Sequence, residues 1–571
     1  MINKTTNLGG IVFAVIIVSL LSGSIALAAA PPADPARPGS GTVLKGVKPP
    51  AVDQPTGQTP SITVEDRQPV IGGDSGQKIA VQSFKIGGES PVSAGELLKL
   101  VQSEAGKETT LGELNKLAAR ITKHLRQQGY LVAFAYIPAQ TITDGVVEIA
   151  VVPGKYDQIN IKGDSKFDAD RLRAMLFCAR PGAVIKRAPL ERALLLMSDI
   201  SGITVKATLT PGGAAGTADL ILETADTAKT SAALYSDNWG NRYTGRVRYG
   251  VQLVVHNASG FGDDFTLGGL TTGEGINNYS FGYSAPLGVD GAKLEIKHSR
   301  VGYTLGGDFA DLGATGHATV TSYSVSYPLV RARTHSLYGT AGYDVKHLRD
   351  DITYYDSYSP KTSGLWNIGL TGNFADSWLG GGNNAFGVTH YRGKLSINDA
   401  DAAATDASYT NTAGNFAKTL FTFQRQQYMA KNLAFNFSFT GQLADKNLDS
   451  SEKLFLGGAD GVRAYPQGEG AGDEGYKLTG EFRWRLPGLS SGKNNLYLNT
   501  FYDYGSVMTS KKPYSTDANR RSLMGAGLGL LWTRDRDFAI RLDYAWKIGE
   551  EAATADTDKS GRIWLQGVKY F

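Results

Sequence analysis

Several chemistries are excluded by what this sequence of 571 residues lacks. It has a single cysteine, Cys178, so it can form neither a disulfide framework nor a thiolate metal site. Its seven histidines are scattered, with no pair at the i, i+4 spacing of a zinc-binding helix. No Gly-x-Ser-x-Gly elbow or other set of nucleophile and base is present. We therefore expect no catalytic site, no bound metal and no cofactor.

The charge balance argues against a nucleic-acid partner. Lys and Arg total 58 and Asp and Glu total 54, which leaves a net charge of only +4. Blocks of basic residues with interleaved stacking aromatics are also absent. No segment after the N-terminal region is apolar enough for a membrane-spanning helix. A membrane crossing by the rest of the chain would therefore require a closed barrel of strands.

The first 30 residues have the pattern of a signal peptide. Lys4 supplies a basic start, and residues 11–21 (IVFAVIIVSLL) form a nearly uninterrupted apolar core, followed by Ala-x-Ala cleavage options. The small residues at 22–24 interrupt the apolar run, which argues against a retained anchor. Residues 31–79 are rich in Pro, Gly, Asp and Thr without periodicity, and they are predicted to be a linker or extended arm.

Residues 80–226 contain two copies of one α+β pattern. In residues 80–154 a strand at 81–86 precedes two helices with capping boxes, at Ser93 and Thr110, and two alternating strands follow. Residues 155–226 repeat this order, with Asp168 as a helix N-cap. Each copy is expected to form a three-stranded sheet with an open edge. An extended polypeptide can add to such an edge as another strand.

The chain from residue 229 to Phe571 reads as strands only, with no helix predicted. Glycine (70 residues) and tyrosine (27 residues) are abundant, although hydrophobic content is ordinary at 42%. Apolar and polar residues alternate in segments of roughly ten residues, and Gly, Asn and Asp turns separate the segments. One face of each segment is apolar and often aromatic, and the other carries full charges. This pattern predicts an antiparallel transmembrane barrel of about 16 strands, with lipid outside and water inside.

One segment, 454–466, interrupts the alternation and reads LFLGGADGVRAYP. Gly457, Gly458 and Gly461 make both a strand and a helix improbable. A constrained loop is therefore predicted between long strands, with Arg463 and Tyr465 close together after an Asp-Gly turn.

Two α+β modules followed by such a barrel resemble one family, the two-partner-secretion translocators. These are the haemolysin-activator and filamentous-haemagglutinin transporters of Gram-negative outer membranes. The resemblance rests on the glycine segment with Val462-Arg463-Ala464-Tyr465, on residues 237–245 (DNWGNRYTG) and on residues 501–505 (FYDYG). Ala464 stands where the superfamily usually has Gly.

The resemblance implies that the modules are POTRA domains and that a loop near residues 454–473 enters the barrel lumen. There Arg463 is expected to meet the acidic residue of the Phe-x-Asp-x-Gly strand. Strand alternation agrees independently, because Leu496 and Leu498 on the lipid face put Asn499, Phe501 and Asp503 inside. The expected site comprises Arg463, Asp503 and Glu481, with loop residues Gly457, Gly458, Val462, Ala464 and Tyr465 and strand residues Phe501 and Gly505. A charge-assisted pair of this kind provides a breakable latch, and the alternative is that Arg463 only rigidifies the barrel.

The implied function is secretion of a dedicated exoprotein, haemolysin-like or adhesin-like, without nucleotide hydrolysis. The modules would lie in the periplasm and recognise the N-terminal secretion domain of the exoprotein. Outer-membrane lipid and the barrel-assembly machinery, which reads a terminal aromatic such as Phe571, are the other implied partners. The alternatives are an insertase that assembles other barrels, for which five modules are expected, and a passive porin, which needs none. Family members often carry an N-terminal plug helix, but the prolines of residues 31–79 predict that it is absent, very short or not helical.

Overall fold

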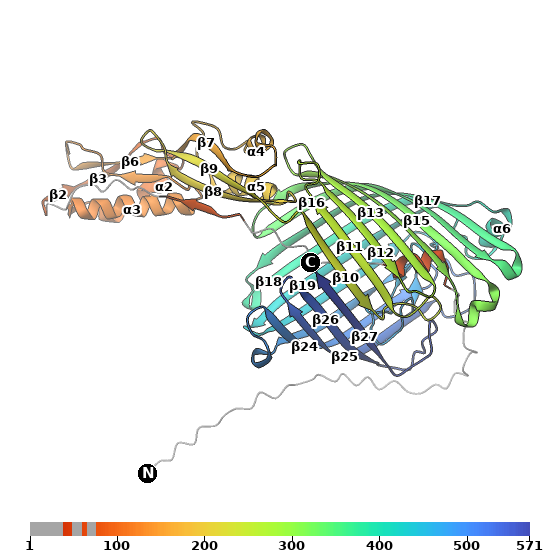
Figure 1. The fold of residues 1–571 in the computed structure, drawn as a ribbon. Coiled ribbons are helices and arrows are strands. Elements are labelled where there is room, and N and C mark those ends of the chain that lie inside the picture. Colours follow the sequence, from red (N-terminus) through yellow and green to blue (C-terminus); the bar gives the residue numbers. More distant parts are fainter. Residues whose placement is uncertain (1–37, 48–59, 66–75) are drawn as a thin grey trace, which may run out of the picture.

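The computed structural model describes residues 38–47, 60–65 and 76–571, so the predicted signal peptide lies outside the described residues. Two small α+β modules lie at one end of a large barrel (Figure 1). We call this end of the barrel the module end and the opposite end the far end. Among the described residues, no helix is both long and apolar enough to cross a membrane.

Sixteen antiparallel strands close the barrel, as the sequence predicted. Each strand pairs with its neighbours along the chain, and the last strand pairs with the first. The closing pair is short, with five residue pairs between β10 and β27 against eighteen between β16 and β17. The strands are β10 (Thr230–Asp237), β11 (Arg248–His256), β12 (Asp264–Thr271), β13 (Ile276–Leu287), β14 (Ala292–Thr304), β15 (Ala314–Arg331), β16 (His335–Ile352), β17 (Ser357–Asp376), β18 (Gly382–Ile397), β19 (Gly414–Ala430), β20 (Leu433–Ala444), β23 (Glu474–Arg485), β24 (Asn494–Met508), β25 (Arg520–Arg534), β26 (Phe538–Lys547) and β27 (Gly561–Tyr570).

The outer surface of the barrel is apolar and aromatic. Trp366, Ile368, Leu528 and Trp532 are among its exposed large side chains, as expected for strands that face lipid. Turns at the module end are short, whereas several connections at the far end are long, including residues 398–413. Short 3₁₀ turns occur at η1 (Gln102–Glu104), η2 (Gly307–Leu312), η3 (Thr353–Tyr355), η4 (Trp378–Gly380) and η5 (Pro487–Leu489).

The prediction that no helix follows residue 229 is wrong, because α6 (Ala400–Ser408) lies between β18 and β19. Its sequence, ADAAATDAS, is rich in alanine, the strongest helix former. The Asp399 carboxylate caps the helix by accepting a hydrogen bond from the Ala402 N–H at 2.9 Å. Asp406 then accepts from the Thr412 N–H at 3.0 Å and the Thr410 hydroxyl at 2.6 Å, which ties the end of the helix to the chain that follows.

Module 1 contains a three-stranded sheet in the order β3-β6-β5, covered by helices. The capping box at Thr110 forms as predicted, with the Glu113 side chain accepting from the Thr110 N–H at 2.8 Å. The single strand expected at residues 81–86 is two strands, and the first of them pairs with β4, which was not predicted. The elements are β2 (Lys78–Val81), β3 (Ser83–Gly88), α2 (Ala94–Lys99), β4 (Lys107–Thr110), α3 (Leu111–Gln127), β5 (Phe134–Tyr136) and β6 (Val146–Val152).

Module 2 repeats the order strand, two helices, two strands. Its elements are β7 (Lys155–Gly163), α4 (Ala169–Met175), α5 (Arg187–Ser198), β8 (Ile203–Pro211) and β9 (Thr217–Asp226). The expected three-stranded sheet with an open edge is wrong here, because a fourth strand, β1 (Ile62–Val64), extends the sheet to the order β1-β8-β9-β7. This strand comes from the arm, which pairs with β8 in parallel.

Module 2 is anchored to turns at the module end of the barrel. The Arg171 guanidinium donates to the backbone carbonyls of Pro286 at 3.0 Å and Gly288 at 2.9 Å. Asp199 forms an ion pair with Arg331 at 2.7 Å, at the end of β15. These contacts hold module 2 against the module end of the barrel.

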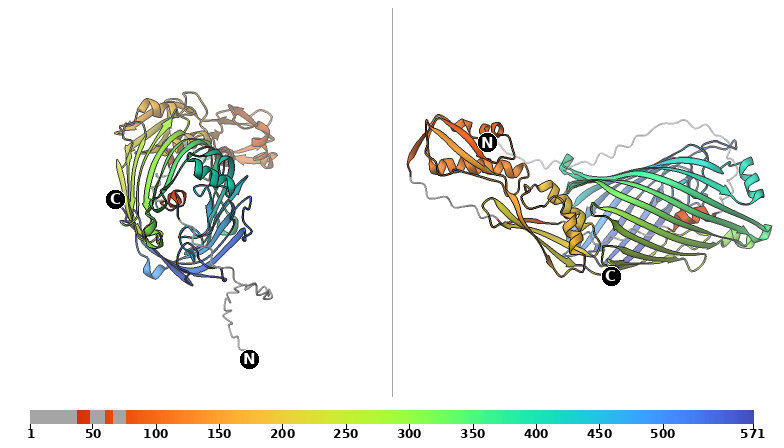
Figure 2. Two further views of the ribbon diagram at one scale, coloured as in Figure 1. Left: turned by 90° about the vertical axis from the view of Figure 1, so that its right-hand side faces the viewer. Right: turned by 90° about the horizontal axis from the view of Figure 1, so that it is seen from above.

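The arm also contributes a short helix, α1 (Ser40–Gly46), which lies inside the ring of strands (Figure 2, left). Val43 packs among barrel side chains that include Tyr243 and Tyr303. The Ser40 N–H donates to the Asp350 carboxylate at 2.6 Å, and Arg248 donates to the Gly46 carbonyl. The prediction of a linker or extended arm is therefore wrong for residues 40–46, and of the three alternatives for the plug the very short helix is the one present.

Candidate functional site

The connection between β20 and β23, residues 445–473, starts at the far end and folds back into the barrel; we call it the lumen loop. Val462, Ala464 and Tyr465 are buried in it against inward-facing side chains of the barrel wall. A two-residue ladder between β21 (Leu454–Phe455) and β22 (Ala471–Gly472) joins its two limbs. Gly458 has a φ of +116°, a conformation that side chains disfavour.

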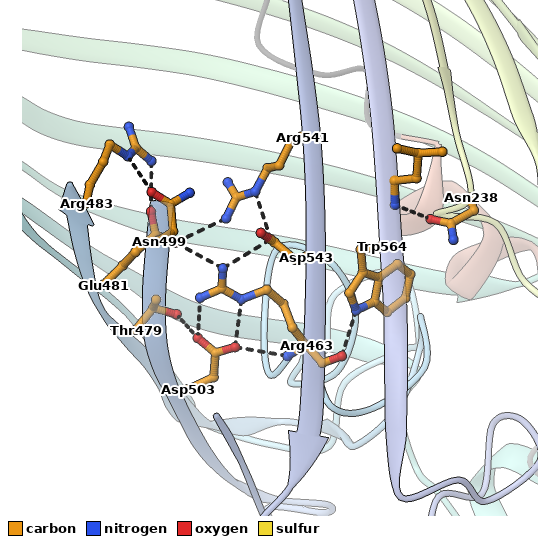
Figure 3. Close-up of polar contacts among 11 residues, drawn as sticks. Asn238, Arg463, Thr479, Glu481, Arg483, Asn499, Asp503, Arg541, Asp543 and Trp564 are labelled. Atoms are coloured by element: carbon orange, nitrogen blue, oxygen red, sulfur yellow. Dashed lines mark hydrogen bonds and ion pairs between the residues drawn. The ribbon is translucent and has the colours of Figure 1, made fainter. Parts of the chain in front are cut away.

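Arg463 is the centre of the contacts between the lumen loop and the wall (Figure 3). Its Nε and Nη2 donate to the two oxygens of Asp503 at 2.8 and 2.9 Å, a bidentate pair. The backbone N–H of Arg463 donates to the same carboxylate at 3.1 Å. The Thr479 hydroxyl completes the shell of Asp503 at 2.8 Å. The structure thus brings together the arginine and the aspartate that the sequence singled out.

Two further carboxylates face Arg463. Its Nη1 donates to Glu481 at 3.0 Å and to Asp543 at 3.3 Å. Arg541 bridges the same two carboxylates, at 3.1 Å from Glu481 and 2.8 Å from Asp543. Arg483 donates to the other oxygen of Glu481 at 2.8 Å. Three carboxylates and three guanidiniums therefore form one network across β23, β24 and β26.

Aromatic side chains also contact Arg463. Its guanidinium carbon lies 3.2 Å from the centroid of the Phe501 ring, a cation–π contact. The indole N–H of Trp564 on β27 donates to the Arg463 carbonyl at 2.6 Å. Tyr465, which follows closely in the loop, donates from its hydroxyl to the Glu551 carbonyl at 3.0 Å. The loop motif is held by its backbone as well as by its charge.

Glycines in the wall make room for the loop. A Cβ at Gly525 would lie 2.6 Å from the Cβ of Ala464, and one at Gly527 would collide with the Phe501 ring. A Cβ at Gly505 would lie 2.8 Å from Leu456 of the loop. Gly525 and Gly505 therefore leave a shallow recess in which the loop lies, and Gly527 leaves room for the Phe501 ring that contacts Arg463.

A second set of ion pairs, which the sequence did not reveal, anchors the lumen loop to other strands. Asp449 pairs with Lys361 of β17 at 2.8 Å. Glu452 pairs with Lys418 of β19 at 2.8 Å and also with Lys346 of β16. In the ring of sixteen strands, β16 lies opposite β26, which carries Asp543. The loop is therefore pinned to both sides of the lumen, by Arg463 on one side and by Asp449 and Glu452 on the other, and Glu469 adds a pair with Arg521 of β25 on the first side.

Two polar cavities flank the lumen loop. One, of about 480 Å³, lies between the loop and α1 and is lined by Lys45, Lys346, Lys418 and Glu452. The other, of about 940 Å³, is lined by polar residues of several strands, including Gln424, Asn436 and Arg483. A polar, water-accessible lumen interrupted by one pinned loop and one short helix suits controlled passage of a polar chain.

Two α+β modules before a closed barrel with an internal loop define a class of outer-membrane transporter. Residues 79–154 match the family described as "POTRA domain, ShlB-type", and residues 216–531, more than half of the chain, match "Haemolysin secretion/activation protein ShlB/FhaC/HecB". The chain belongs to this family of haemolysin secretion/activation proteins. It is accordingly a two-partner-secretion transporter of the outer membrane, with its modules on the periplasmic side.

Curated relatives agree with this assignment, and a solved structure has the same fold. The "Heme/hemopexin transporter protein HuxB" of Haemophilus influenzae (strain 86-028NP) is 27% identical over 83% of this chain and 84% of its own length. The "Outer membrane transporter CdiB" of Dickeya dadantii (strain 3937) is 23% identical over 77% of this chain and 78% of its own. The structure of "CdiB from Escherichia coli" matches the fold with a TM-score of 0.67 at 19% identity, over 89% of this chain and 92% of that one.

Proposed function

We propose that this chain binds an extended segment of its exoprotein in a groove of module 1 and passes the unfolded polypeptide through the barrel when the lumen loop moves. The groove is the observation that carries the first step. It lies between α3 and β5, has a volume of about 710 Å³, and is lined by both apolar and basic side chains, among them Ala119, Lys123 and Tyr136. An added strand would extend the sheet β3-β6-β5 at its β5 edge.

The outer edge of β5 is held by side chains that an incoming strand can replace. The Ala135 N–H donates to the Thr122 hydroxyl at 2.9 Å, and the Arg126 guanidinium donates to the Ala133 carbonyl at 3.2 Å. Both partners come from α3, one helical turn apart. Exchange of these side chains for the backbone of a bound peptide would leave no edge group unpaired, so binding has a small desolvation cost.

We infer that the second step depends on Arg463 as a latch. The network around Asp503, Glu481 and Asp543 supports this role because its bonds are directional and yet can re-form after a chain has passed. No nucleotide or catalytic group is required in this scheme; folding of the exoprotein outside the cell would make passage irreversible. Outer-membrane lipid and the barrel-assembly machinery complete the proposed set of partners.

We propose the following boundaries for these units: a signal peptide at 1–30, an arm at 31–79, modules at 80–154 and 155–226, and a barrel at 229–571. The two modules support secretion over the insertase alternative. A passive porin has no use for a peptide groove. The insertase and the transporter alternatives can be distinguished by depleting this protein and measuring the assembly of other outer-membrane barrels. Depletion of an insertase would leave many barrels unassembled, whereas depletion of a transporter would not.

Filling the groove of module 1 tests the first step. Ala119→Trp places a large ring in the groove from the exposed side of α3, and we expect secretion of the exoprotein, identified from the neighbouring gene, to fall by about tenfold or more. Lys116→Trp adds the same ring to the same helix outside the groove lining and should leave secretion unchanged. The measurement is exoprotein in the medium at equal amounts of heat-modifiable, folded barrel. Equal secretion by the two variants would contradict recognition through this groove.

A further inference from the structure

Basic side chains gather on one sector of the outer wall of the barrel, near the far end. Five of them are exposed, and we call them the basic patch: Arg300 on β14, His347 and Arg349 on β16, and Arg392 and Lys394 on β18. All five lie in the last third of their strands, which run from the module end to the far end. The outer wall is otherwise largely apolar, so a concentration of charge on it needs a physical reason.

Strand alternation shows that the side chains of the basic patch point away from the lumen. On β14, Val301 packs in the cluster around α1 inside the barrel, so its neighbour Arg300 faces outward. On β16, Lys346 reaches the lumen loop, so residues 347 and 349 face outward. On β18, Tyr391 lines the cavity beside α1, so residues 392 and 394 face outward. The basic patch therefore lies on the surface that faces the membrane.

Most of the charge in the basic patch is not neutralised by the protein. The side chains of Arg300, Arg392 and Lys394 form no ion pair with any other residue in the described part of the chain. Arg349 pairs with Asp351 at 2.8 Å. Around the rest of the described barrel wall, the outward positions near the far end carry one further Lys or Arg, Arg520 of β25. The charge is thus concentrated on β14 to β18, and its counter-charge must come from outside the chain.

Aromatic side chains place the basic patch at the level of the lipid headgroups. Trp366, which is 68% exposed, lies directly opposite Arg392 on the neighbouring strand. Tyr279, which is 57% exposed, lies directly opposite Arg300. Exposed Trp and Tyr side chains of transmembrane barrels form girdles at the two membrane interfaces, where a cation costs far less than at the bilayer midplane. Arg300 and Arg392 therefore lie at a depth where phosphate groups are within reach.

We propose that the basic patch is a binding site for the phosphate groups of a phosphorylated glycolipid in the outer leaflet of the outer membrane. The modules are periplasmic, so the far end of the barrel lies at the outer leaflet. Arginine donates to phosphate oxygens in pairs, and the unpaired Arg300 and Arg392 are free to do so. The acyl chains lie on the exposed aliphatic surface toward the module end, which includes Ile368 and Leu370. This site is independent of how the chain transports its exoprotein.

The bound lipid joins the strands that hold the lumen loop on their inner side. From β14 to β18 the basic patch crosses four strand spacings, about 19 Å, so one headgroup with several phosphates bridges neighbouring strands. On the inner faces of β16 and β17, Lys346 and Lys361 pair with the loop carboxylates Glu452 and Asp449. The lipid therefore stabilises the part of the wall to which these carboxylates are anchored.

Lipid binding to the purified full-length protein tests the site. The probe is bisphosphorylated lipid A, titrated into the protein in detergent, and native mass spectrometry measures the fraction of protein that carries the lipid. We expect the double variant Arg300→Gln with Arg392→Gln to bind this lipid about tenfold or more weakly than the unmodified protein, because it loses two cations that have no partner in the chain. Dephosphorylated lipid A should bind weakly and equally to both proteins.

Two further variants make the measurement specific. Arg520→Gln with Lys297→Gln removes the same charge outside the basic patch, because Lys297 faces the lumen and pairs with Glu295 at 2.9 Å, and it should bind the lipid normally. Arg300→Lys with Arg392→Lys keeps the charge and should retain most of the binding, which separates loss of charge from a folding defect. Equal affinity of the glutamine variant and the unmodified protein, or equal weakening in the control outside the patch, would overturn the proposal.

Discussion

Replacing Arg463 by alanine is expected to reduce secretion by about tenfold or more while the barrel remains folded. The change leaves Asp503 without its bidentate partner, and Glu481 and Asp543 with only Arg483 and Arg541. Removing one partner of a buried ion pair costs about 3–5 kcal/mol, because the remaining charge stays out of bulk water. The lumen loop should therefore leave its recess on the β23–β26 side and take up several positions. Few of these positions restore the resting arrangement of the lumen from which secretion starts.

Two variants make this test specific. Arg463→Lys keeps the charge but loses the fork that holds both oxygens of Asp503, so an intermediate loss of secretion is expected. Arg485→Ala removes another arginine from β23, one whose Nε donates to the Asn495 side chain at 2.8 Å, away from the three carboxylates, and it should secrete nearly normally. The readout is exoprotein in the medium at equal amounts of heat-modifiable barrel. If Arg463→Ala secretes as much exoprotein as the unmodified protein, the proposed role of Arg463 as a latch is refuted.

Part of this network is predictable from the sequence, because successive side chains of a strand point alternately into the lumen and toward the lipid. Along β24 this alternation places Phe501 and Asp503 inside, and along β23 it places Glu481 inside, which brings two of the three carboxylates to one wall. Asp543 also lies on an inward-facing position, but its approach to Arg463 depends on the stagger between β25 and β26 and on the small size of Gly525, Gly527 and Gly529. That relation between strands is a property of the closed barrel and is not contained in any one segment.

The second set of ion pairs between the lumen loop and the barrel wall had no comparable signal in the sequence. Asp449 and Glu452 lie in a loop without periodicity, and their partners come from three strands far away in the sequence. The same reason applies to α1 and β1. A helix of seven residues and a strand of three are unstable alone, so only the barrel wall and the edge of β8 stabilise them. Local propensity in a proline-rich arm cannot indicate such partners.

The anchors at Arg463 and at Glu452 have opposite charge patterns, so removal of either charge should change the lumen in opposite ways. On the β23–β26 side the wall supplies three carboxylates to Arg463 of the loop, and Arg521 of β25 pairs separately with the loop carboxylate Glu469. On the other side the wall supplies lysines and the loop supplies Asp449 and Glu452. Loss of Arg463 therefore leaves an excess of negative charge beside the pore, and loss of the Glu452 charge leaves an excess of positive charge.

Glu452→Gln is accordingly expected to open the pore and make it more selective for anions. Glu452 is the carboxylate shared by Lys346 and Lys418, and Lys45 of α1 lines the same cavity, so the variant leaves this group of lysines with one carboxylate fewer. Their repulsion should loosen both α1 and the adjacent limb of the loop. In planar bilayers we expect single-channel conductance to rise about twofold or more and the reversal potential in a salt gradient to shift toward that of the anion.

The control for this change is Glu474→Gln, which removes a carboxylate that pairs with Lys511 at 2.7 Å, in a less buried position at the start of β23. It should leave conductance and selectivity nearly unchanged. Arg463→Ala should shift the reversal potential in the opposite direction from Glu452→Gln, toward that of the cation, because it exposes Asp503, Glu481 and Asp543 to the pore. Shifts of the same sign in both variants would show that the loop is not held by oppositely charged anchors, and the account of a loop pinned from both sides would then be wrong.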